Sequence, residues 1–133
     1  MTKNTNRRRF VLATAASLAV AAMPVFAHPP TEKKMYGLIG KMKIAPGQRA
    51  TVIGHLLQGV QSMPGCLSYI VAEDPTDPDA IWITEAWDSK ESHQASLTLP
   101  AVQQAIKLAR PFIAGFGERF ETVPVGGPGL LAG

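Results

Sequence analysis

Hydrophobic positions along the chain follow two different periods. Apolar side chains recur at every second position over residues 35–44, Cys66–Glu73 and Ala80–Trp87, which is typical of β-strands. Over residues 48–62 they recur at helical spacing and form one stripe, made of Val52, Ile53, Leu56, Leu57 and Val60. The pattern therefore predicts a strand, a helix and two further strands, separated by proline- and glycine-containing turns.

The segment after the third predicted strand reads as two consecutive helices. Asp88 is expected to cap the first helix, because Glu91 stands three residues later, where the acid of a capping box belongs. This helix should end before Pro100, which suits the first turn of a second helix over residues 101–109. Pro111 is expected to kink or restart that second helix.

A fourth strand is predicted over residues 119–125, between a short leader at 28–34 and a flexible glycine-rich tail at 126–133. The resulting order over residues 35–125 is β-α-β-β-α-β. This is the order of the ferredoxin-like α+β fold, in which both helices cover one face of an antiparallel sheet. We therefore expect a single domain of this class.

The predicted strands carry apolar side chains on both faces. In the third strand one face has Ile81, Ile83, Glu85 and Trp87, and the other has Trp82, Thr84 and Ala86. The helices of the chain can cover only one of these faces, and large apolar groups on the other would remain in water. The sequence therefore predicts a homodimer built sheet against sheet, with Trp82 and Trp87 on opposite sides.

Residues 1–27 have the layout of a twin-arginine signal peptide. Residues 6–11 read NRRRFV, an alanine-rich apolar stretch follows, and Ala27 ends it. This layout predicts export to the periplasm by the twin-arginine route, with a mature chain that starts at His28 and no longer contacts the membrane. The alternative is an uncleaved anchor, but the stretch is shorter than the roughly 20 residues of a spanning helix and Pro24 interrupts it.

Removal of the signal changes the charge of the chain. Four of the 13 basic residues and none of the ten acidic residues lie in 1–27, which leaves nine basic and ten acidic side chains. This balance gives no reason to expect nucleic acid or an anionic membrane as a partner. Cys66 is the only cysteine, so an internal disulfide is excluded, and it reads as a small buried residue.

Four short motifs resemble the antibiotic biosynthesis monooxygenase family. They are APGQ at 45–48, MPGC at 63–66, EAWDS at 85–89 and LP at 99–100. The resemblance implies a dimeric α+β barrel with a small apolar cavity in each subunit. It also implies oxygenation of a small quinol- or polyphenol-type aromatic by O2 with no metal, flavin or haem. A non-catalytic dimeric module that binds a small aromatic ligand is the alternative.

The family comparison also bears on individual residues. Many members carry a histidine nine positions after the tryptophan, where this chain has Ser96, whereas its own helix histidine is His93. The two residues are three apart and share a helix face, so His93 could take the phenolic proton while Ser96 or an arginine steadies the oxyanion. A solvent-facing His93 is the alternative. The haem-degrading branch relies on an asparagine in the first strand, and residues 35–44 contain none.

Further candidate site residues accompany His93 and Ser96. Glu85, among apolar neighbours, is either a catalytic base or a partner of Arg110 or Arg119 in an ion pair. The candidate substrate-binding residues are Trp87, Tyr36, Tyr69, Arg110, Phe112 and Phe116, and the aromatic ones could instead be simple core. His55 is expected at the surface, outside the apolar stripe of its helix.

No metal site is expected. Asp74, Asp77 and Asp79 lack the glycine and closing glutamate of a calcium loop, and the prolines between them favour a hairpin turn. An N-terminal His28 could chelate copper through its amine and ring, but no nearby residue supplies a further ligand.

Overall fold

The computed structural model describes residues 19, 21–24 and 33–130 of the chain. The predicted signal peptide and leader therefore lie largely outside the described residues, as does the end of the predicted tail. None of the helices in the described ranges has the length and apolar character that crossing a membrane requires. Every helix and strand discussed below lies within residues 33–130, which we call the folded unit.

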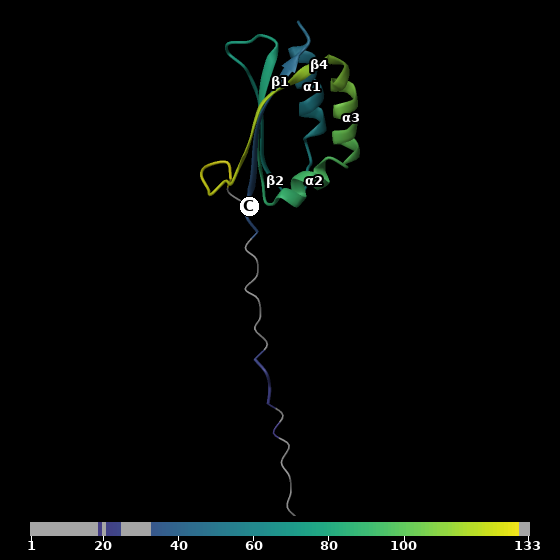
Figure 1. Cartoon of the computed structure of the whole chain (residues 1–133). Helices are drawn as coiled ribbons and strands as arrows, with labels where there is room; N and C mark the ends of the chain where they lie inside the picture. Colours follow the sequence, from purple (N-terminus) through teal and green to yellow (C-terminus); the bar gives the residue numbers. More distant parts are fainter. Residues whose placement is uncertain (1–18, 20, 25–32, 131–133) are drawn as a thin grey trace, which may run out of the picture. The chain divides into compact units, whose positions relative to one another are not determined.

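The folded unit is a four-stranded antiparallel sheet with helices on one face (Figure 1). Its elements in chain order are β1 Tyr36–Ile44, α1 Arg49–Gly59, β2 Cys66–Glu73, β3 Ala80–Trp87, α2 Lys90–Ser96, α3 Pro100–Ala109, the 3₁₀ turn η1 Arg110–Phe112 and β4 Ile113–Thr122. The strands lie in the order β2-β3-β1-β4. The ferredoxin-like α+β prediction is confirmed.

The strand register defines what faces the helices. Tyr36 of β1 lies opposite Trp87 of β3, and Leu38 lies opposite Glu85. On its other side Glu85 lies opposite Tyr69 of β2. Because side chains alternate along a strand, all five residues point to the same face, and Glu85 is held between Leu38 and Tyr69.

Two buried clusters fill the space between the sheet and the helices. The first comprises Ile44, Val52, Leu56, Ile81 and Ala109, and the second comprises Tyr36, Met63, Trp87 and Val102. Trp87 is fully buried, whereas Trp82 lies on the opposite face of β3. The predicted division of the two tryptophans between the two faces is therefore confirmed.

The fourth strand begins earlier than the sequence predicted. β4 covers Ile113–Thr122 rather than 119–125. Pro111 ends α3 in a single 3₁₀ turn, and the backbone N–H of Ala45 then donates to the carbonyl of Phe112 at 2.7 Å. This bond brings the chain directly alongside β1. Glycines in the first half of β4 interrupt the alternating pattern that would have revealed it.

The cap of α2 is Ser89 rather than Asp88. The Ser89 side chain accepts a hydrogen bond from the backbone N–H of Ser92 at 3.2 Å, and its own backbone is extended. The backbone N–H of Asp88 is instead bonded to the carbonyl of Gly65 at 2.9 Å, which holds Asp88 in the connection from β3. Glu91 does occupy the first turn of the helix, as expected. Serine and aspartate are nearly equivalent caps, so composition could not separate the two positions.

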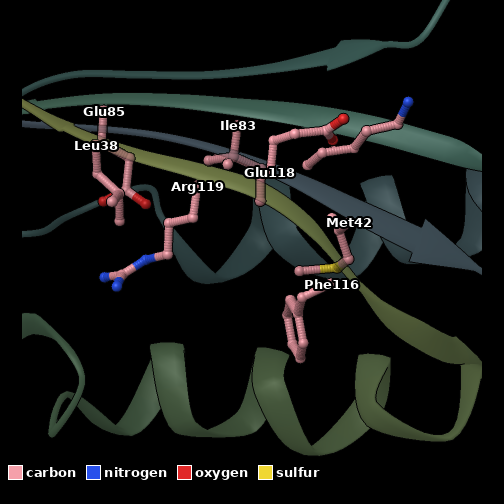
Figure 2. Close-up of a pocket in the computed structure, with 10 residues that line it drawn as sticks. Leu38, Met42, Ile83, Glu85, Phe116, Glu118 and Arg119 are labelled. Carbon is pink, nitrogen blue, oxygen red and sulfur yellow. The ribbon is translucent and has the colours of Figure 1, made fainter.

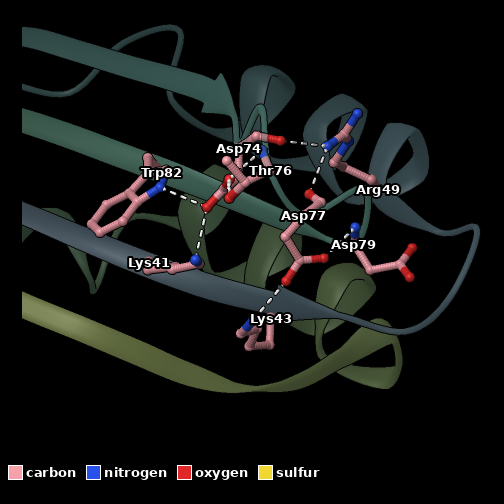
Figure 3. Close-up of polar contacts among 8 residues, drawn as sticks. All are labelled: Lys41, Lys43, Arg49, Asp74, Thr76, Asp77, Asp79 and Trp82. Atoms are coloured by element: carbon pink, nitrogen blue, oxygen red, sulfur yellow. Dashed lines mark hydrogen bonds and ion pairs between the residues drawn. The ribbon is translucent and has the colours of Figure 1, made fainter.

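The turn between β2 and β3 is held by a polar network on the open face of the sheet (Figure 3). The Asp74 carboxylate pairs with Lys41 Nζ at 2.7 Å and accepts from Trp82 Nε1 at 3.0 Å. Both the backbone N–H and the hydroxyl of Thr76 donate to it at 2.8 Å. These contacts, led by Lys41, hold the pKa of Asp74 well below its usual range. The predicted hairpin turn is confirmed, and the aspartates act within it.

Candidate active site

A cavity of about 190 Å³ lies between the sheet and the helices. The sheet contributes Met42, Tyr69, Ile83 and Glu85, and the helices and their connections contribute Leu56, Val60, Met63, His93, Ser96, Leu97, Val102, Ala105 and Ile106. An engineered apolar cavity of about 150 Å³ is large enough to bind benzene, so this space suits one aromatic ring. The three predicted catalytic residues, Glu85, His93 and Ser96, all line it.

Glu85 is the acidic group of this cavity. Its side chain is only 10% exposed, and its Oε2 accepts a hydrogen bond from Trp87 Nε1 at 2.8 Å. The two residues are neighbours on the same face of β3, so the strand itself sets the geometry of the bond. Burial raises the pKa of Glu85 above its usual value, against the opposing effects of the Trp87 hydrogen bond and the charge of Arg119.

His93 faces Glu85 from α2. Its Nε2 lies 3.7 Å from Glu85 Oε2, which is longer than a hydrogen bond. The imidazole packs between two aromatic rings, with centroids 5.2 Å from Tyr36 and 5.5 Å from Trp87. Burial lowers the pKa of His93, and the positive charge of Arg119 adds to this.

These two shifts bring the proton affinities of the pair together. An ordinary glutamate and histidine have pKa values of 4.5 and 6.5, and here the glutamate value is raised and the histidine value is lowered. Both shifts favour the neutral form of the group, so the uncharged carboxyl and the uncharged imidazole are each stabilised relative to ordinary side chains. Burial is the largest cause of each shift, so the apolar cavity rather than the mutual contact tunes the pair.

Ser96 is buried at the end of α2, where its hydroxyl donates to the backbone carbonyl of His93 at 2.6 Å. Its proton is thus engaged within the helix, and the residue lines the cavity. The role of Ser96 or an arginine in steadying an oxyanion stays a prediction. The spacing from His93 predicted the shared face but not the direction of the hydroxyl.

The two tyrosines occupy different places. Tyr69 lines the cavity, and burial raises the pKa of its hydroxyl. Tyr36 lies beyond His93, where its hydroxyl donates to Glu121 at 3.0 Å and Lys90 Nζ lies 5.4 Å from its ring. Tyr36 therefore supports the histidine ring.

Trp87 is fully buried and does not line the cavity, and two further predicted binding residues lie away from it. Arg110 borders a separate surface groove along α3, together with Gln103 and Lys107. Phe112 packs against the first core cluster. Pro111 turns the chain between them, so neither side chain is brought to Glu85.

A second hollow of about 240 Å³ adjoins the cavity on the side of β4 (Figure 2). It shares Met42, Ile83 and Glu85 with the cavity, and it adds Leu38, Gly40, Lys41, Phe116, Gly117, Glu118 and Arg119. Phe116, a predicted binding residue, lines this second hollow and not the cavity. Arg119 was expected only as a partner of Glu85, and Gly40 was not expected there at all. Their common register, Gly40 opposite Arg119, became visible only when β4 was placed.

The sequence model of the antibiotic biosynthesis monooxygenase family matches residues 35–108, more than half of the chain. The chain belongs to this family. A crystal structure of a homologue from Chloroflexus aurantiacus J-10-fl that carries the family name is 67% identical, with a TM-score of 0.70 over 72% of this chain and 98% of that one. No curated protein is similar enough to count as a match.

More distant structures agree on the fold alone. A homologue from Caulobacter crescentus CB15 is 19% identical, with a TM-score of 0.64 over 71% of this chain and 93% of that one. The protein PA3566 from Pseudomonas aeruginosa is 15% identical, with a TM-score of 0.62 over 71% and 98%. In this family member, Phe116 and Arg119 lie beyond the residues that the family model matches.

Proposed function

We propose that this family member is a cofactor-independent monooxygenase that oxidises a small quinol- or polyphenol-type aromatic with O2. The observation that carries the proposal is the Glu85–His93 pair, whose side chains are 10% and 12% exposed and line a largely apolar cavity of about 190 Å³. Membership of the monooxygenase family supports the reaction class. The size and lining of the cavity support a small aromatic substrate.

A quinol supplies its own electrons, so the reaction balances without another reductant. His93 accepts a phenolic proton, with Glu85 beside it, and the phenolate then transfers an electron to O2. Recombination of the two radicals forms a carbon–oxygen bond and a ring hydroperoxide. Loss of water from the hydroperoxide gives a hydroxylated quinone, so one oxygen atom enters the product and the other leaves as water. A dry cavity keeps the radical pair together until it recombines.

The test is O2 uptake by metal-free protein with a panel of quinols, measured above autoxidation. The expected result is enzyme-dependent uptake, with one water formed per hydroxylated quinone. Heat-denatured protein and chelator-treated protein are the controls. Uptake that persists unchanged after denaturation would overturn the proposal.

The alternative is a non-catalytic module that binds a small aromatic ligand. The 3.7 Å separation of His93 Nε2 and Glu85 Oε2 favours it, because the two groups are not joined by a hydrogen bond. Under this alternative, a quinol would bind at one molecule per subunit. It would be recovered unchanged in air, apart from its own autoxidation.

We also propose that the protein is a homodimer. One row across the open face of the sheet runs through Ile70, Thr84, Ile39 and Phe120, one residue from each strand. Ile70 and Phe120 are 55% and 54% exposed. Burying an isoleucine- or phenylalanine-sized side chain is worth about 1.5–3 kcal/mol, so the row favours a partner sheet.

The proposed location is the periplasm, reached by the twin-arginine route that residues 1–27 predict. Replacing the arginine pair, Arg7→Lys with Arg8→Lys, should keep the precursor in the cytoplasm, as cell fractionation would measure. Lys3→Arg is the matched control and should leave export unchanged. Full-length cytoplasmic protein from the unmutated chain would contradict this proposal.

A further inference from the structure

The hollow beside β4 forms an outer extension of the cavity, and we call it the β4 mouth. Its wall on the helix-facing side of the sheet consists of Leu38, Gly40, Met42, Phe116 and Arg119. The proposed reaction uses Glu85 and His93 but none of these five residues. The β4 mouth therefore has no role in the proposed reaction as described so far.

Gly40 provides the space in the mouth. It lies in the middle of β1, where side chains normally fill the gap to the helices. A Cβ atom at this position would meet no atom within 4 Å. Gly40 therefore leaves an open volume directly opposite Arg119.

Phe116 provides an aromatic wall. It lies opposite Met42 in the register, and its ring extends from β4 toward the helix layer (Figure 2). The side chain is 76% exposed although it is large and apolar. An exposed ring at the edge of a hollow offers a flat surface on which a ligand ring can stack.

Arg119 provides a positive charge. Its side chain extends toward the helix layer, whereas that of Glu118 extends away from it (Figure 2). Glu121 is engaged by Tyr36 and Lys90, at 3.0 and 3.4 Å. Within residues 33–130 the structure gives Arg119 no ion pair, so its guanidinium is available to an anion.

The positions of Glu85 and Arg119 define what could bridge them. Glu85 lies opposite Leu38 on one side of β1, and Arg119 lies opposite Gly40 on the other side. Ideal sheet spacings place their backbones about 12 Å apart, with both side chains directed into the same hollow. A substituted aromatic ring lying between the two side chains can contact both.

We infer that the β4 mouth selects an aromatic acid: a phenol or quinol ring whose hydroxyl lies at the Glu85–His93 pair and whose carboxylate is bound by Arg119. This inference rests on the proposed function and names its substrate class. Arginine can bind a carboxylate through two parallel hydrogen bonds, which makes the contact both strong and directional. Gly40 and Phe116 would hold the part of the ring between the two polar ends.

The test compares two ligands that differ only in the carboxylate: 6-hydroxy-2-naphthoate and 2-naphthol. Neither is a quinol, so their binding to the mature protein, residues 28–133, can be measured by calorimetry without turnover. We expect about tenfold tighter binding of the acid. Arg119→Gln should remove this preference and leave 2-naphthol binding unchanged, and Arg119→Lys should keep part of it.

Two further variants separate the mouth from general effects. Arg110→Gln removes an arginine from the groove on α3 and should leave both affinities unchanged. Gly40→Leu fills the mouth and should weaken both ligands. Circular dichroism would establish that each variant is folded.

Three results would overturn the inference: equal affinity of the protein for the two ligands, an equal loss of affinity for both ligands in Arg119→Gln, or no binding of either ligand. These results are independent of the proposed reaction. Enzyme-dependent O2 uptake with neutral quinols, together with no preference for the acid, would leave the proposed function in place and reject only the aromatic acid. Tighter binding of the acid together with no O2 uptake would leave the aromatic acid in place and reject the proposed reaction.

Discussion

Two carboxylates of this protein, those of Asp74 and Glu85, each accept a hydrogen bond from a tryptophan of β3, and they lie on opposite faces of the sheet. Asp74 accepts from Trp82 at 3.0 Å on the open face of the sheet, and Glu85 accepts from Trp87 at 2.8 Å on the helix-facing side. The pKa of Asp74 is lowered, whereas the pKa of Glu85 is raised. The tryptophan bond alone therefore does not determine the protonation state of a carboxylate.

The difference lies in the other contacts of each group. Asp74 is neutralised by Lys41 at 2.7 Å and receives two further hydrogen bonds from Thr76. Within residues 33–130, the one basic side chain at ion-pair distance from Glu85 is that of His93 at 3.7 Å, whose pKa is lowered, and Glu85 borders a cavity. A carboxylate whose bonds are satisfied holds a turn in place, whereas a buried one that lacks a strong partner can exchange a proton with a ligand.

The largest expected effect is a loss of activity that distinguishes Glu85 from Asp74. Glu85→Gln keeps the size of the side chain and removes its ability to exchange a proton, so kcat/KM for O2 uptake should fall about 10²- to 10⁴-fold. Steady-state O2 electrode measurements on the quinol panel would test this.

The matched control is Asp74→Asn, which should leave kcat/KM unchanged and lower the melting temperature instead. Loss of activity in both variants would mean that Glu85 acts through folding alone. Unchanged activity in Glu85→Gln would remove the carboxylate from the proposed mechanism.

The sequence predicted the Glu85 site better than its outer extension. Alternation along residues 80–87 placed Glu85 and Trp87 on one face, and helical spacing placed His93 with Ser96. Both are local periodicities that the backbone enforces directly. Arg119 and Gly40 are far apart in sequence, and they meet only through the register of β4 with β1.

The misplaced start of β4 explains the rest of the difference. Residues 113–118 contain two glycines, so their alternation was too weak to predict a strand. Phe112 was expected near the substrate because it is aromatic, and Arg110 because it is a possible partner of Glu85. A single turn at Pro111 directs the chain elsewhere, and nothing in the local pattern specifies that direction.

The next effect concerns the face on which Asp74 and Trp82 lie. Phe120→Glu places a charge in the exposed row of that face and should weaken the proposed dimer about 10²-fold or more, because the change occurs twice in a symmetric interface. Sedimentation at micromolar concentration would report monomers.

Leu57→Glu is the control for this experiment, since Leu57 is exposed on α1 and lies outside the sheet. It should leave the molecular mass unchanged. A well-folded monomer formed by the unmutated mature protein would reject the proposed sheet-to-sheet packing.

The smallest expected effect is the pH dependence of stability, and here the two carboxylates should have opposite signs. The folded pKa of Glu85 is above 4.5, so the folded state holds this proton more tightly, and the resulting stabilisation is lost as the pH rises through the folded pKa. The folded pKa of Asp74 is below 3.8, so its contribution is present above pH 3.8 and is lost as the pH falls through the folded pKa.

Urea unfolding of the wild type and of the two amide variants across the acidic and neutral range would measure these signs. The stability advantage of the wild type over Asp74→Asn should shrink below pH 3.8. Relative to Glu85→Gln, the wild type should instead become less stable above pH 4.5, because the variant no longer has a buried carboxyl that must ionise. Difference curves of the same sign for both variants would contradict the distinction between the two sites, since each would then behave as an ordinary paired carboxylate.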